Sequence, residues 1–420
     1  LRKRLALSLR SKEAVTDDEQ EQVRKQAQGP EHRPLVCLGP PGTGKTTVVR
    51  QIIKEALQEG AAVLFALPTA QLASRMREKL GDHPNLVVET STAAFRLHID
   101  EQEGIHAMFG YDVVVADELS QLSQRDFERI LRQWHAAEKT PTLVFLGDKY
   151  QLAGIDPTRP WESSAWNRHG LRFVELHEVH RSNDEGFLAT LHLLRVAMPT
   201  QMQLNNICRN HKAWVGDEPD ASDIGRLLRE HPEATFVATT RQGVATINKL
   251  ALAATFPRAQ PKATLPGTWE DNPDNYINTK LREDRRPQPS MVPIYKKMKL
   301  YLTRNVRKED DYINGMLCTV LSFDVAKQVL WVRTRTNKRL PITPWHDPEH
   351  HGLVYYPIRS GYCSTVHKVQ GDEFPFIIVY MDTANKPAVG YTALSRVGDS
   401  NSYLLGGHIT PLHFVPATMK

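Results

Sequence analysis

Short, wholly apolar runs alternate with longer amphipathic stretches over the first part of the chain. Four such runs lie at residues 35–38, 63–67, 113–116 and 143–146. Runs of this kind are typical of strands that are buried on both faces of a parallel sheet. Between the first two, apolar residues recur at helical spacing from Val48 to Leu57, and Gly60 stands where the helix should end. The pattern predicts a βαβ unit and therefore an α/β fold.

The same alternation returns later in the chain. Residues 182–184 (Ser-Asn-Asp) are good N-cap types for a helix over 187–194. Residues 234–238, 377–380 and 403–405 have the apolar character of strands. We therefore expect a second α/β domain.

The region between these strands has a different pattern. Residues 255–293 hold seven prolines and mixed charge, which predicts a long surface connection. From 300 to 356 the pattern changes to short β-like pieces at 317–323 and 328–333, with the Asn-Gly pair at 314–315 as a turn signal. A small β-rich insertion is expected here.

Length and charge limit the classes of protein to consider. With 420 residues the chain is too long for one hydrophobic core and should form two or three domains. Lysine and arginine exceed aspartate and glutamate by 53 to 48, which is compatible with a polyanionic partner. No apolar run approaches the roughly 20 residues of a membrane span, so no membrane partner is expected.

Cysteine usage and the first residues bear on the compartment. The four cysteines have no CxxC spacing, which favours a reducing compartment and structural thiols over disulfides or a metal site. They are Cys37, Cys208, Cys318 and Cys363. The opening LRKRLALSLRSKEA has a short apolar core for a signal peptide and no initiator Met. We expect an excised fragment of an intracellular protein, in the nucleus or mitochondrion of a eukaryote and in the cytoplasm otherwise.

Residues 39–46 read GPPGTGKT, which satisfies GxxxxGK[ST] between a predicted strand and a predicted helix. Glycines let backbone N–H groups surround phosphates, and the helix N-terminus adds positive charge. Lys45 would reach the β/γ-phosphate oxygens, and Thr46 would bind Mg²⁺. This motif predicts a nucleoside triphosphate site, and the alternative is a Gly/Pro turn without a ligand.

Acidic and amide side chains follow the next two predicted strands. Asp117 and Glu118 come directly after 113–116, and Gln151 follows 143–146 within GDKYQL. One carboxylate can hold Mg²⁺ while its neighbour orients or deprotonates the attacking water. The Gln151 amide can donate to a phosphate oxygen and accept from that water. A carboxylate pair at a strand end is more often a helix cap, but the P-loop favours a catalytic site.

The order of these motifs resembles helicases of superfamily one, group B, above all the Pif family (petite integration frequency) and its RecD-like relatives. The matching stretches are EQEQV at 19–23, LPTA at 67–70, TST at 90–92, DELS at 117–120, GDKYQL at 147–152, LHEVHRS at 176–182, TR at 240–241 with Asn248, LTRN at 302–305, YING at 312–315, STVHKVQGDEF at 364–374 and YTALSR at 391–396. The text between DELS and GDKYQL, and the AGI that follows GDKYQL, departs from the Pif signature. The resemblance is therefore to the group as a whole.

The resemblance implies an α/β fold with two RecA-like P-loop NTPase domains, each with a parallel sheet. A small β-barrel insertion is expected in the second domain and a small wedge insertion in the first. The expected bounds are 1–15 for an N-terminal extension, 16–175 for the first RecA-like domain with its insertion at about 93–110, 176–310 and 357–420 for the second, and 311–356 for the barrel.

The resemblance also implies a nucleotide site. Gln20 would read the adenine, with Gln22 as an alternative, and Arg181 and Arg396 would act as arginine fingers on the γ-phosphate. The implied catalytic residues are Lys45, Asp117, Glu118, Gln151, Arg181 and Arg396. The implied ATP-binding residues are Gln20, Gly39, Pro40, Pro41, Gly42, Thr43, Gly44, Lys45, Thr46, Thr47, Gly371 and Glu373, with Thr46 and Asp117 as ligands of Mg²⁺.

Contacts with a single nucleic-acid strand are implied in the same way. Such contacts use hydroxyls, backbone N–H groups and aromatic rings, independently of base identity. The candidates are Pro68, Thr69, Thr92, Phe95, Ser364, Thr365 and His367. In STVHKVQGDEF, residues 364, 365 and 367 would face the strand, and Gln370-Gly371 and Glu373 the nucleotide. Taken singly, each polar residue is more often a cap or a turn residue.

The implied function is an ATP-dependent DNA helicase that moves 5′ to 3′ on single-stranded DNA and unwinds duplex junctions, as a monomer or a weakly self-associating chain. An RNA helicase and a nucleic-acid-stimulated ATPase without unwinding are open alternatives, because contacts to phosphates do not distinguish the sugars. The histidines of WHDPEHHG at 345–352 have no Cys partners, and we do not expect them to bind a metal.

Overall fold

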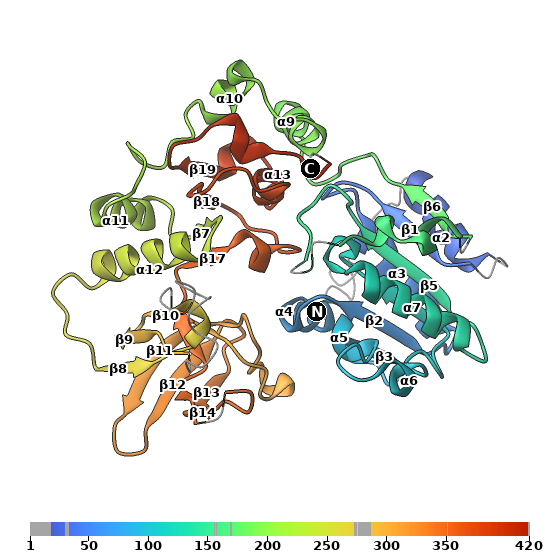
Figure 1. Cartoon of the computed structure of the whole chain (residues 1–420), viewed down its shortest axis with the longest axis horizontal. Helices are drawn as coiled ribbons and strands as arrows, with labels where there is room; N and C mark the ends of the chain where they lie inside the picture. Colours follow the sequence, from blue (N-terminus) through green and yellow to red (C-terminus); the bar gives the residue numbers. More distant parts are fainter. Residues whose placement is uncertain are drawn as a thin grey trace, which may run out of the picture. The chain divides into compact units, whose positions relative to one another are not determined.

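The computed structural model describes residues 18–29, 33–154, 156, 158–168, 170–272, 275, 287–350 and 352–418. This part of the chain forms two compact units, and Figure 1 follows the chain through both in colour. The first unit contains the described residues up to Pro68, Met76–Lys149 and Ala153–Arg181, and the second contains Thr69–Arg75, Tyr150–Leu152 and the described residues from Ser182 onward. The extension predicted at 1–15 lies outside the described residues.

A six-stranded parallel sheet forms the centre of the first unit. Its order is β3-β2-β4-β5-β1-β6, and every neighbouring pair is parallel. The strands are β1 Leu35–Leu38, β2 Val63–Leu67, β3 Leu86–Thr90, β4 Val113–Ala116, β5 Thr142–Gly147 and β6 Arg172–Glu175. Every residue of β1, β2 and β4 is buried. The four apolar runs in the sequence are thus confirmed as strands of one parallel sheet.

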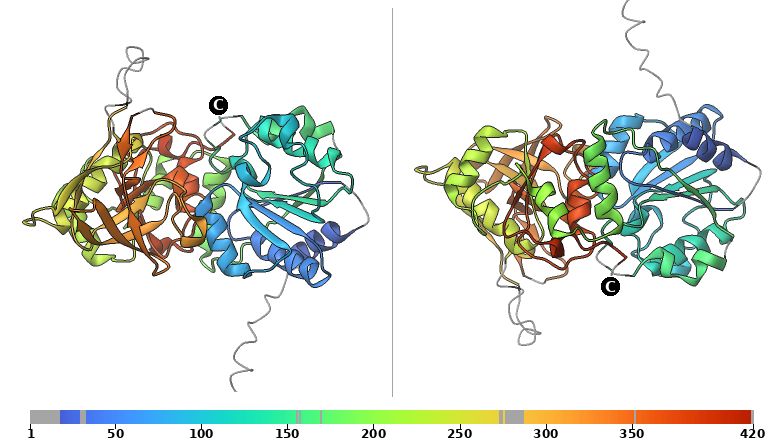
Figure 2. Two further views of the ribbon diagram at one scale, coloured as in Figure 1. Left: turned by 90° about the horizontal axis from the view of Figure 1, so that it is seen from below. Right: turned by 90° about the horizontal axis from the view of Figure 1, so that it is seen from above.

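Helices cover both faces of this sheet. The helices up to β6 are α2 Asp18–Gln28, α3 Lys45–Gln58, α4 Ala70–Leu80, α5 Ser91–Ala94, α6 Glu101–Gly104, α7 Gln124–Ala136 and α8 Ser164–Arg168, with 3-10 turns η1 Leu119–Gln121 and η2 Pro160–Glu162. Alternate strand residues such as Val36, Leu64 and Val114 share a core with Phe127 and Trp134 of α7. Figure 2 shows the blue helices α2 and α3 on the opposite side of the sheet from α7. Among the described residues, no helix is both long and apolar enough to cross a membrane.

A four-stranded parallel sheet of order β17-β7-β18-β19 forms the centre of the second unit. Its strands are β7 Thr235–Ala238, β17 Cys363–Thr365, β18 Ile377–Tyr380 and β19 Tyr403–Gly406, and its helices are α9 Glu185–Val196, α10 Gln201–Cys208, α11 Ala221–Glu230, α12 Arg241–Thr255 and α13 Val389–Leu394, with 3-10 turns η7 Val366–Val369, η8 Ser400–Ser402 and η9 Pro411–Phe414. Phe236 and Ile378 pack in one core with α11 and α12. Val237 and Val379 pack in another core with Phe187 of α9. A second α/β domain is confirmed.

Antiparallel strands form the rest of the second unit. A five-stranded sheet has the order β13-β12-β11-β10-β16, and two small sheets pair β8 with β9 and β14 with β15. The bounds are β8 Ala263–Pro266, β9 Met291–Ile294, β10 Lys299–Leu302, β11 Leu317–Asp324, β12 Val329–Thr334, β13 Arg339–Ile342, β14 Trp345–His346, β15 Val354–Tyr355 and β16 Ile358–Ser360, with η3 Trp269–Asp271 and η6 Lys308–Asp310. In Figure 1 these yellow and orange strands gather beside the parallel sheet of the same unit. The predicted β-rich insertion is present, with wider bounds than 311–356.

The prediction of a plain surface connection at 255–293 is wrong for its two ends. Strands β8 and β9 pair there, and Leu265, Val292 and Ile294 are buried in the core of the antiparallel sheet. Both prolines in these strands are tolerated because a two-stranded sheet leaves each strand a free edge, where a missing N–H costs no ladder hydrogen bond. The proline count alone did not reveal this edge position.

We expect Phe127→Ala to destabilise the first unit by about 3–5 kcal/mol, because it deletes a fully buried ring and leaves a cavity. The measurement is urea unfolding followed by tryptophan fluorescence, since the ring of Trp166 lies 5.6 Å from that of Phe127. Phe173→Ala is the matched control, because Phe173 is 47% exposed and its loss should cost less than about 1 kcal/mol. Equal losses in both variants would contradict the described core.

Candidate functional site

The P-loop links the end of β1 to the start of α3. Gly44 caps α3 in the left-handed region, with φ 79°, a conformation that favours glycine. The Lys45 ammonium donates to the carbonyl groups of Gly39 (2.7 Å) and Pro40 (2.9 Å), and the Thr43 hydroxyl also donates to Pro40 (2.9 Å). The predicted residues 39–46 therefore form one closed loop at a helix N-terminus, which is a ready anion site.

Gln20 of α2 supports this loop from behind. Its side chain is buried and donates from Nε2 to the carbonyl of Thr43 at 3.2 Å. A Cβ at Gly44 would lie only 2.2 Å from that nitrogen, so glycine is required for the amide to lie there. Gln22 is exposed on the same helix. Of the two candidates, the structure brings Gln20 to the loop.

The segment that ends in Arg181 passes beside the same loop. The Glu19 carboxylate accepts hydrogen bonds from the backbone N–H groups of His177 (2.7 Å) and Glu178 (3.3 Å). The N–H of His180 donates to the carbonyl of Gly42 at 2.8 Å. The resemblance places this segment in the second domain, but these bonds group it with the first unit. Arg181 thus lies next to the P-loop, because a Cβ at Gly42 would meet its Cβ at 2.7 Å.

Asp117 and Glu118 stand at the carboxyl end of β4. Burial and the charge of Glu118 raise the pKa of Asp117 to about 7, while the N–H of Glu118 and the ammonium of Lys45 oppose the shift. That N–H donates to Asp117 Oδ1 at 2.8 Å. Glu118 itself has φ 56°, an uncommon conformation for a residue with a side chain. The pair is held in a strained turn, as is frequent at functional sites.

Asp148 is a further acidic residue at the carboxyl edge of the first parallel sheet, and it was not among the predicted site residues. It is only 1% exposed and follows β5 directly. Burial lowers the pKa of Lys45, and the charge of Asp148 is the largest effect that opposes this lowering. The available signal was the GD pair of GDKYQL, in which only Gln151 was considered.

The STVHKVQGDEF stretch covers β17 and η7 in the second unit. Ser364 is buried and accepts a hydrogen bond from Arg359 Nη2 at 3.4 Å, whereas His367 is exposed and Thr365 is half-buried. Asn248 of α12 fixes the start of the stretch, because its Oδ1 accepts from the N–H of Cys363 at 3.0 Å. The backbone therefore presents residues 365 and 367, and not Ser364, to solvent.

Three predicted catalytic motifs meet within the second unit. Gln370 Nε2 donates to Gln151 Oε1 (3.3 Å) and to the carbonyl of Leu152 (3.1 Å). Arg396 is 3% exposed and donates from Nη1 to the carbonyl of Asp372 at 3.3 Å. The Asp372 carboxylate, which the sequence reasoning did not select, forms an ion pair with Arg75. Gly371 has φ 82°, and Glu373 is exposed.

Cations gather around the same stretch. They are Arg241, Arg359, His367, Lys368 and Lys386. Loss of hydration, followed by the charges of Lys386 and Arg241, lowers the pKa of His367. Loss of hydration and the charge of Arg359 lower the pKa of Lys368 to about 8, and the nearby carboxylates of Asp271 and Glu270 oppose this lowering. An anion bound here would relieve this repulsion, which makes the cluster a candidate phosphate-binding surface.

The other residues predicted to contact a nucleic-acid strand differ in how far they are buried. Phe95 is fully buried in the core of the first unit, so its ring cannot stack on a base, and the prediction for this residue is corrected. Thr92 is exposed and Pro68 is half-buried. The Thr69 hydroxyl accepts from the N–H of Leu72 at 3.3 Å, which is the cap role that isolated threonines often have.

A further group of polar residues lies at the 347–350 turn. Asp347, Glu349 and His350 offer ligand atoms within 4.8 Å of one another. Burial acts to raise the pKa of Asp347, but hydrogen bonds from the Glu349 N–H, the Tyr355 hydroxyl and the His350 N–H lower it to about 2. Trp269 Nε1 also donates to this carboxylate at 3.3 Å. Protein donors thus satisfy Asp347, which links η3 to the 347–355 turn.

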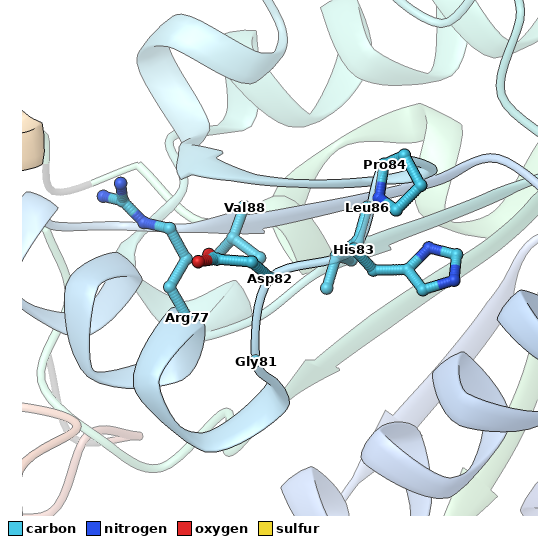
Figure 3. Close-up of a pocket in the computed structure, with 7 residues that line it drawn as sticks. All are labelled: Arg77, Gly81, Asp82, His83, Pro84, Leu86 and Val88. Atoms are coloured by element: carbon cyan, nitrogen blue, oxygen red, sulfur yellow. The ribbon is translucent and has the colours of Figure 1, made fainter.

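A surface cavity of about 350 Å³ lies between the end of α4 and β3. Figure 3 shows its lining, with the Arg77 guanidinium at one end and the His83 ring at the other. The lining residues are Arg77, Gly81, Asp82, His83, Pro84, Leu86 and Val88. None of them belongs to a predicted motif, so the cavity is separate from the candidate nucleotide residues.

The chain is similar to known proteins. Residues 15–217 match a family model described as an AAA domain. Over 402 residues the chain is 25% identical to the ATP-dependent RecD2 DNA helicase of Deinococcus radiodurans, and the match covers 91% of this chain and 48% of that protein. The chain therefore spans about half the length of this curated relative.

Solved structures of Pif1 helicases are similar over nearly the whole chain. One concerns DNA unwinding at forked dsDNA by two coordinating Pif1 helicases; it has a TM-score of 0.69 and 18% identity and covers 96% of this chain and 94% of that one. Pif1 helicase from Bacteroides in complex with ADP-AlF3 and ssDNA has a TM-score of 0.67 and 17% identity, with the same coverage. The chain has the fold of these Pif1 helicases. The resemblance drawn from its motifs is confirmed.

We expect the Asp117 carboxyl group to titrate near pH 7, because burial and the charge of Glu118 both disfavour its ionised form. Glu118→Gln removes the second cause and should lower this pKa. Carbon-13 NMR titration of labelled aspartates measures both proteins. Asp112 is the internal control, since its hydrogen bond from Lys139 holds its pKa below the usual range. An Asp117 pKa that does not respond to Glu118→Gln would contradict the described pair.

Proposed function

We propose that this chain is an ATP-dependent DNA helicase that couples Mg-ATP hydrolysis to 5′-to-3′ movement on single-stranded DNA and to duplex unwinding. The observation that carries the proposal is the charged edge of the first sheet. There, the charges of Asp148 and Asp117 act on the pKa of the buried Lys45 ammonium of the P-loop, and the Lys45 charge acts on the pKa of Asp117. This arrangement suits binding and hydrolysis of a nucleoside triphosphate.

ATP would occupy the loop at the N-terminus of α3. Lys45 would exchange its hydrogen bonds to the Gly39 and Pro40 carbonyls for bonds to the β/γ-phosphate oxygens. The N–H groups of residues 42–47 would surround the phosphates. Gln20 would hydrogen-bond to the edge of the adenine. Its contact with Gly44 would also stabilise the conformation of the P-loop.

Magnesium fits the side chains at this edge, because the hydroxyl of Thr46 and the carboxylate of Asp117 are oxygen ligands, which Mg²⁺ prefers. When bound, the ion would neutralise charge on the phosphates. Glu118 would orient and deprotonate the attacking water. The raised pKa of Asp117 is consistent with a carboxylate pair that a divalent cation would stabilise in its ionised form.

Arg181 and Arg396 are proposed as arginine fingers, and Gln151 as the residue that positions the water. Arg181 already lies beside Gly42. Arg396 donates to the carbonyls of Thr392 and Asp372, so it would have to exchange these bonds when it reaches a γ-phosphate. An arginine that must change partners couples hydrolysis to a conformational step.

Single-stranded DNA would contact the exposed part of the STVHKVQGDEF stretch. Thr365 and His367 would bind phosphates, together with Arg241 and Lys386 of the cation cluster. DNA is proposed over RNA because the curated relative is a DNA helicase and the Bacteroides structure contains ssDNA. Polarity rests on the family resemblance.

The same stretch would couple the two ligands. Gln370 and Gly371 lie next to Gln151, whereas Thr365 and His367 lie at the other end of η7. A change of hydrogen-bond partner at Gln370 would shift η7. It would therefore also shift the DNA contacts proposed for Thr365 and His367. The chain would work as a monomer or a weakly self-associating protein.

The decisive experiment is unwinding of duplexes that carry either a 5′ or a 3′ single-stranded tail, as DNA and as RNA. We expect ATP-dependent unwinding of the 5′-tailed DNA, and no unwinding with Lys45→Ala, which removes the phosphate-binding ammonium. Lys54→Ala is the matched control, because Lys54 is an exposed residue of the same helix. Preferred unwinding of the 3′-tailed duplex would contradict the proposed 5′-to-3′ polarity. Preferred unwinding of RNA would contradict DNA as the substrate. Normal unwinding by Lys45→Ala would contradict the proposed ATP site.

We expect Arg396→Ala to bind ATP with little change in affinity but to lose at least about a hundredfold in turnover, since arginine fingers contribute 10³–10⁵ to the rate. Nucleotide binding is measured with a fluorescent ATP analogue, and turnover by phosphate release with single-stranded DNA. Arg396→Lys tests whether folding is intact, because it keeps a buried cation at this place. Wild-type turnover in Arg396→Ala would remove its role as a finger.

A further inference from the structure

One carboxylate joins the ends of two neighbouring strands in the second unit. Asp382 lies two residues after β18, and Thr239 and Thr240 directly follow β7, the strand that pairs with β18. Asp382 Oδ1 accepts from the N–H groups of Thr239 (2.9 Å) and Thr240 (3.2 Å) and from the Thr239 hydroxyl (2.7 Å). The Thr240 hydroxyl donates to Oδ2. Four donors from two residues therefore converge on one side chain.

The Asp382 carboxylate fixes the N-terminus of α12. Thr240 is the N-cap of this helix, and its hydroxyl accepts from the N–H of Gly243 at 2.9 Å. A Cβ at Gly243 would lie 2.6 Å from the carboxylate, so glycine is required for this close approach. A negative charge is favourable here, because the first N–H groups of a helix have no partners within it. Arg241, the first residue of α12, therefore extends from a backbone that Asp382 holds.

The loop that follows Asp382 is bound to the same threonine. The N–H of Thr383 donates to the Thr239 hydroxyl at 3.1 Å, and Lys386 Nζ donates to the Thr239 carbonyl at 2.9 Å. Thr239 is only 4% exposed, so it makes these bonds beneath the surface. Residues 382–386 thus form one hydrogen-bonded loop around Thr239.

The helix N-terminus and the loop each supply a cation to the cluster around STVHKVQGDEF. Loss of hydration and the charges of Lys386 and Arg241 lower the pKa of His367, so both cations lie near its ring. By its charge alone, a carboxylate beside such a cluster would repel a polyanion. The hydrogen bonds of Asp382 supply a structural reason for its presence, because they hold both elements that carry these cations.

We propose that Asp382 is a positioning residue for single-strand binding, which holds the N-terminus of α12 and the 382–386 loop so that Arg241 and Lys386 reach the phosphates. The inference rests on the proposed function. Removal of the carboxylate has two opposite effects on DNA affinity, because the lost charge favours binding and the lost hydrogen bonds release the two cations. The second effect is the larger, since four donors lose their acceptor at once.

The test measures binding of a fluorescent oligothymidine to the full chain by anisotropy at several salt concentrations. Asp382→Ala should weaken binding about tenfold. The slope of log affinity against log salt should become shallower by about 1.4, because each single-strand phosphate contact contributes about 0.7 and two cations are displaced. Asp382→Asn should retain most of the affinity, because its side-chain oxygen still accepts the three hydrogen bonds made to Oδ1.

Thr239→Val separates positioning from charge. It leaves the net charge unchanged and removes a hydroxyl that is too buried to contact DNA. The DNA concentration that gives half-maximal ATP turnover should rise about fivefold, the loss expected for about one hydrogen bond. Turnover at saturating DNA should stay within about twofold of the unmodified chain.

Glu218→Ala is the matched control for the loss of a negative charge. Glu218 is exposed, and burial, the charge of Glu218 and that of Asp382 all raise the pKa of Tyr380, so both carboxylates lie near the end of β18. Among the described residues, no hydrogen bond joins Glu218 to residues 239–241. Its removal should leave the affinity for oligothymidine unchanged or slightly higher.

Binding by Asp382→Ala that is as tight as that of the unmodified chain, or tighter, would overturn the inference. An unchanged salt slope, or an equal loss of affinity in Glu218→Ala, would do the same. If Asp382→Ala does not fold, Thr239→Val decides, and a parallel fall of its turnover at saturating DNA would show a merely structural role. An unmodified chain that hydrolyses ATP but does not bind the oligothymidine would refute the proposed function itself.

Discussion

Burial of opposite charges at the carboxyl edge of one parallel sheet is the constraint on which the candidate nucleotide site depends. A buried ammonium or carboxylate is costly unless an opposite charge lies close by. Lys45 begins a helix after β1, Asp117 follows β4 and Asp148 follows β5, and these strands are neighbours in the order β4-β5-β1. The strand order thus brings together charges that would each be unfavourable alone. The same proximity makes the ionisation of Lys45 and Asp117 sensitive to a phosphate or a metal ion.

Polar side chains bound to backbone groups fix the loops around this edge and in the second unit. Gln20 binds the Thr43 carbonyl, Glu19 binds the His177 N–H, and Asn248 binds the Cys363 N–H. Each of these side chains stabilises the loop that it binds, whether or not it also contacts a ligand. Substitution at such positions should act on catalysis through geometry, which distinguishes them from the groups that react.

Much of the fold could be predicted because strands buried on both faces must be wholly apolar, as in residues 35–38 and 113–116. The strands at the two ends of 255–293 could not be predicted, because their prolines are acceptable only at sheet edges, and the sequence does not reveal which strands lie at an edge. Phe95 was misassigned because a motif match does not say which way a ring points. The grouping of Arg181 with the first unit depends on long-range backbone hydrogen bonds, and Asp148 was missed because its burial is a tertiary property.

The lowered pKa of Lys368 gives the cation cluster a property beyond attraction of phosphates. With a pKa of about 8, a part of the molecules carries no charge on Lys368 in mildly alkaline solution. A bound phosphate favours the protonated amine and raises its pKa again. Binding of a phosphate at this cluster would then take up protons from solvent, and its affinity would fall as the pH rises through about 8.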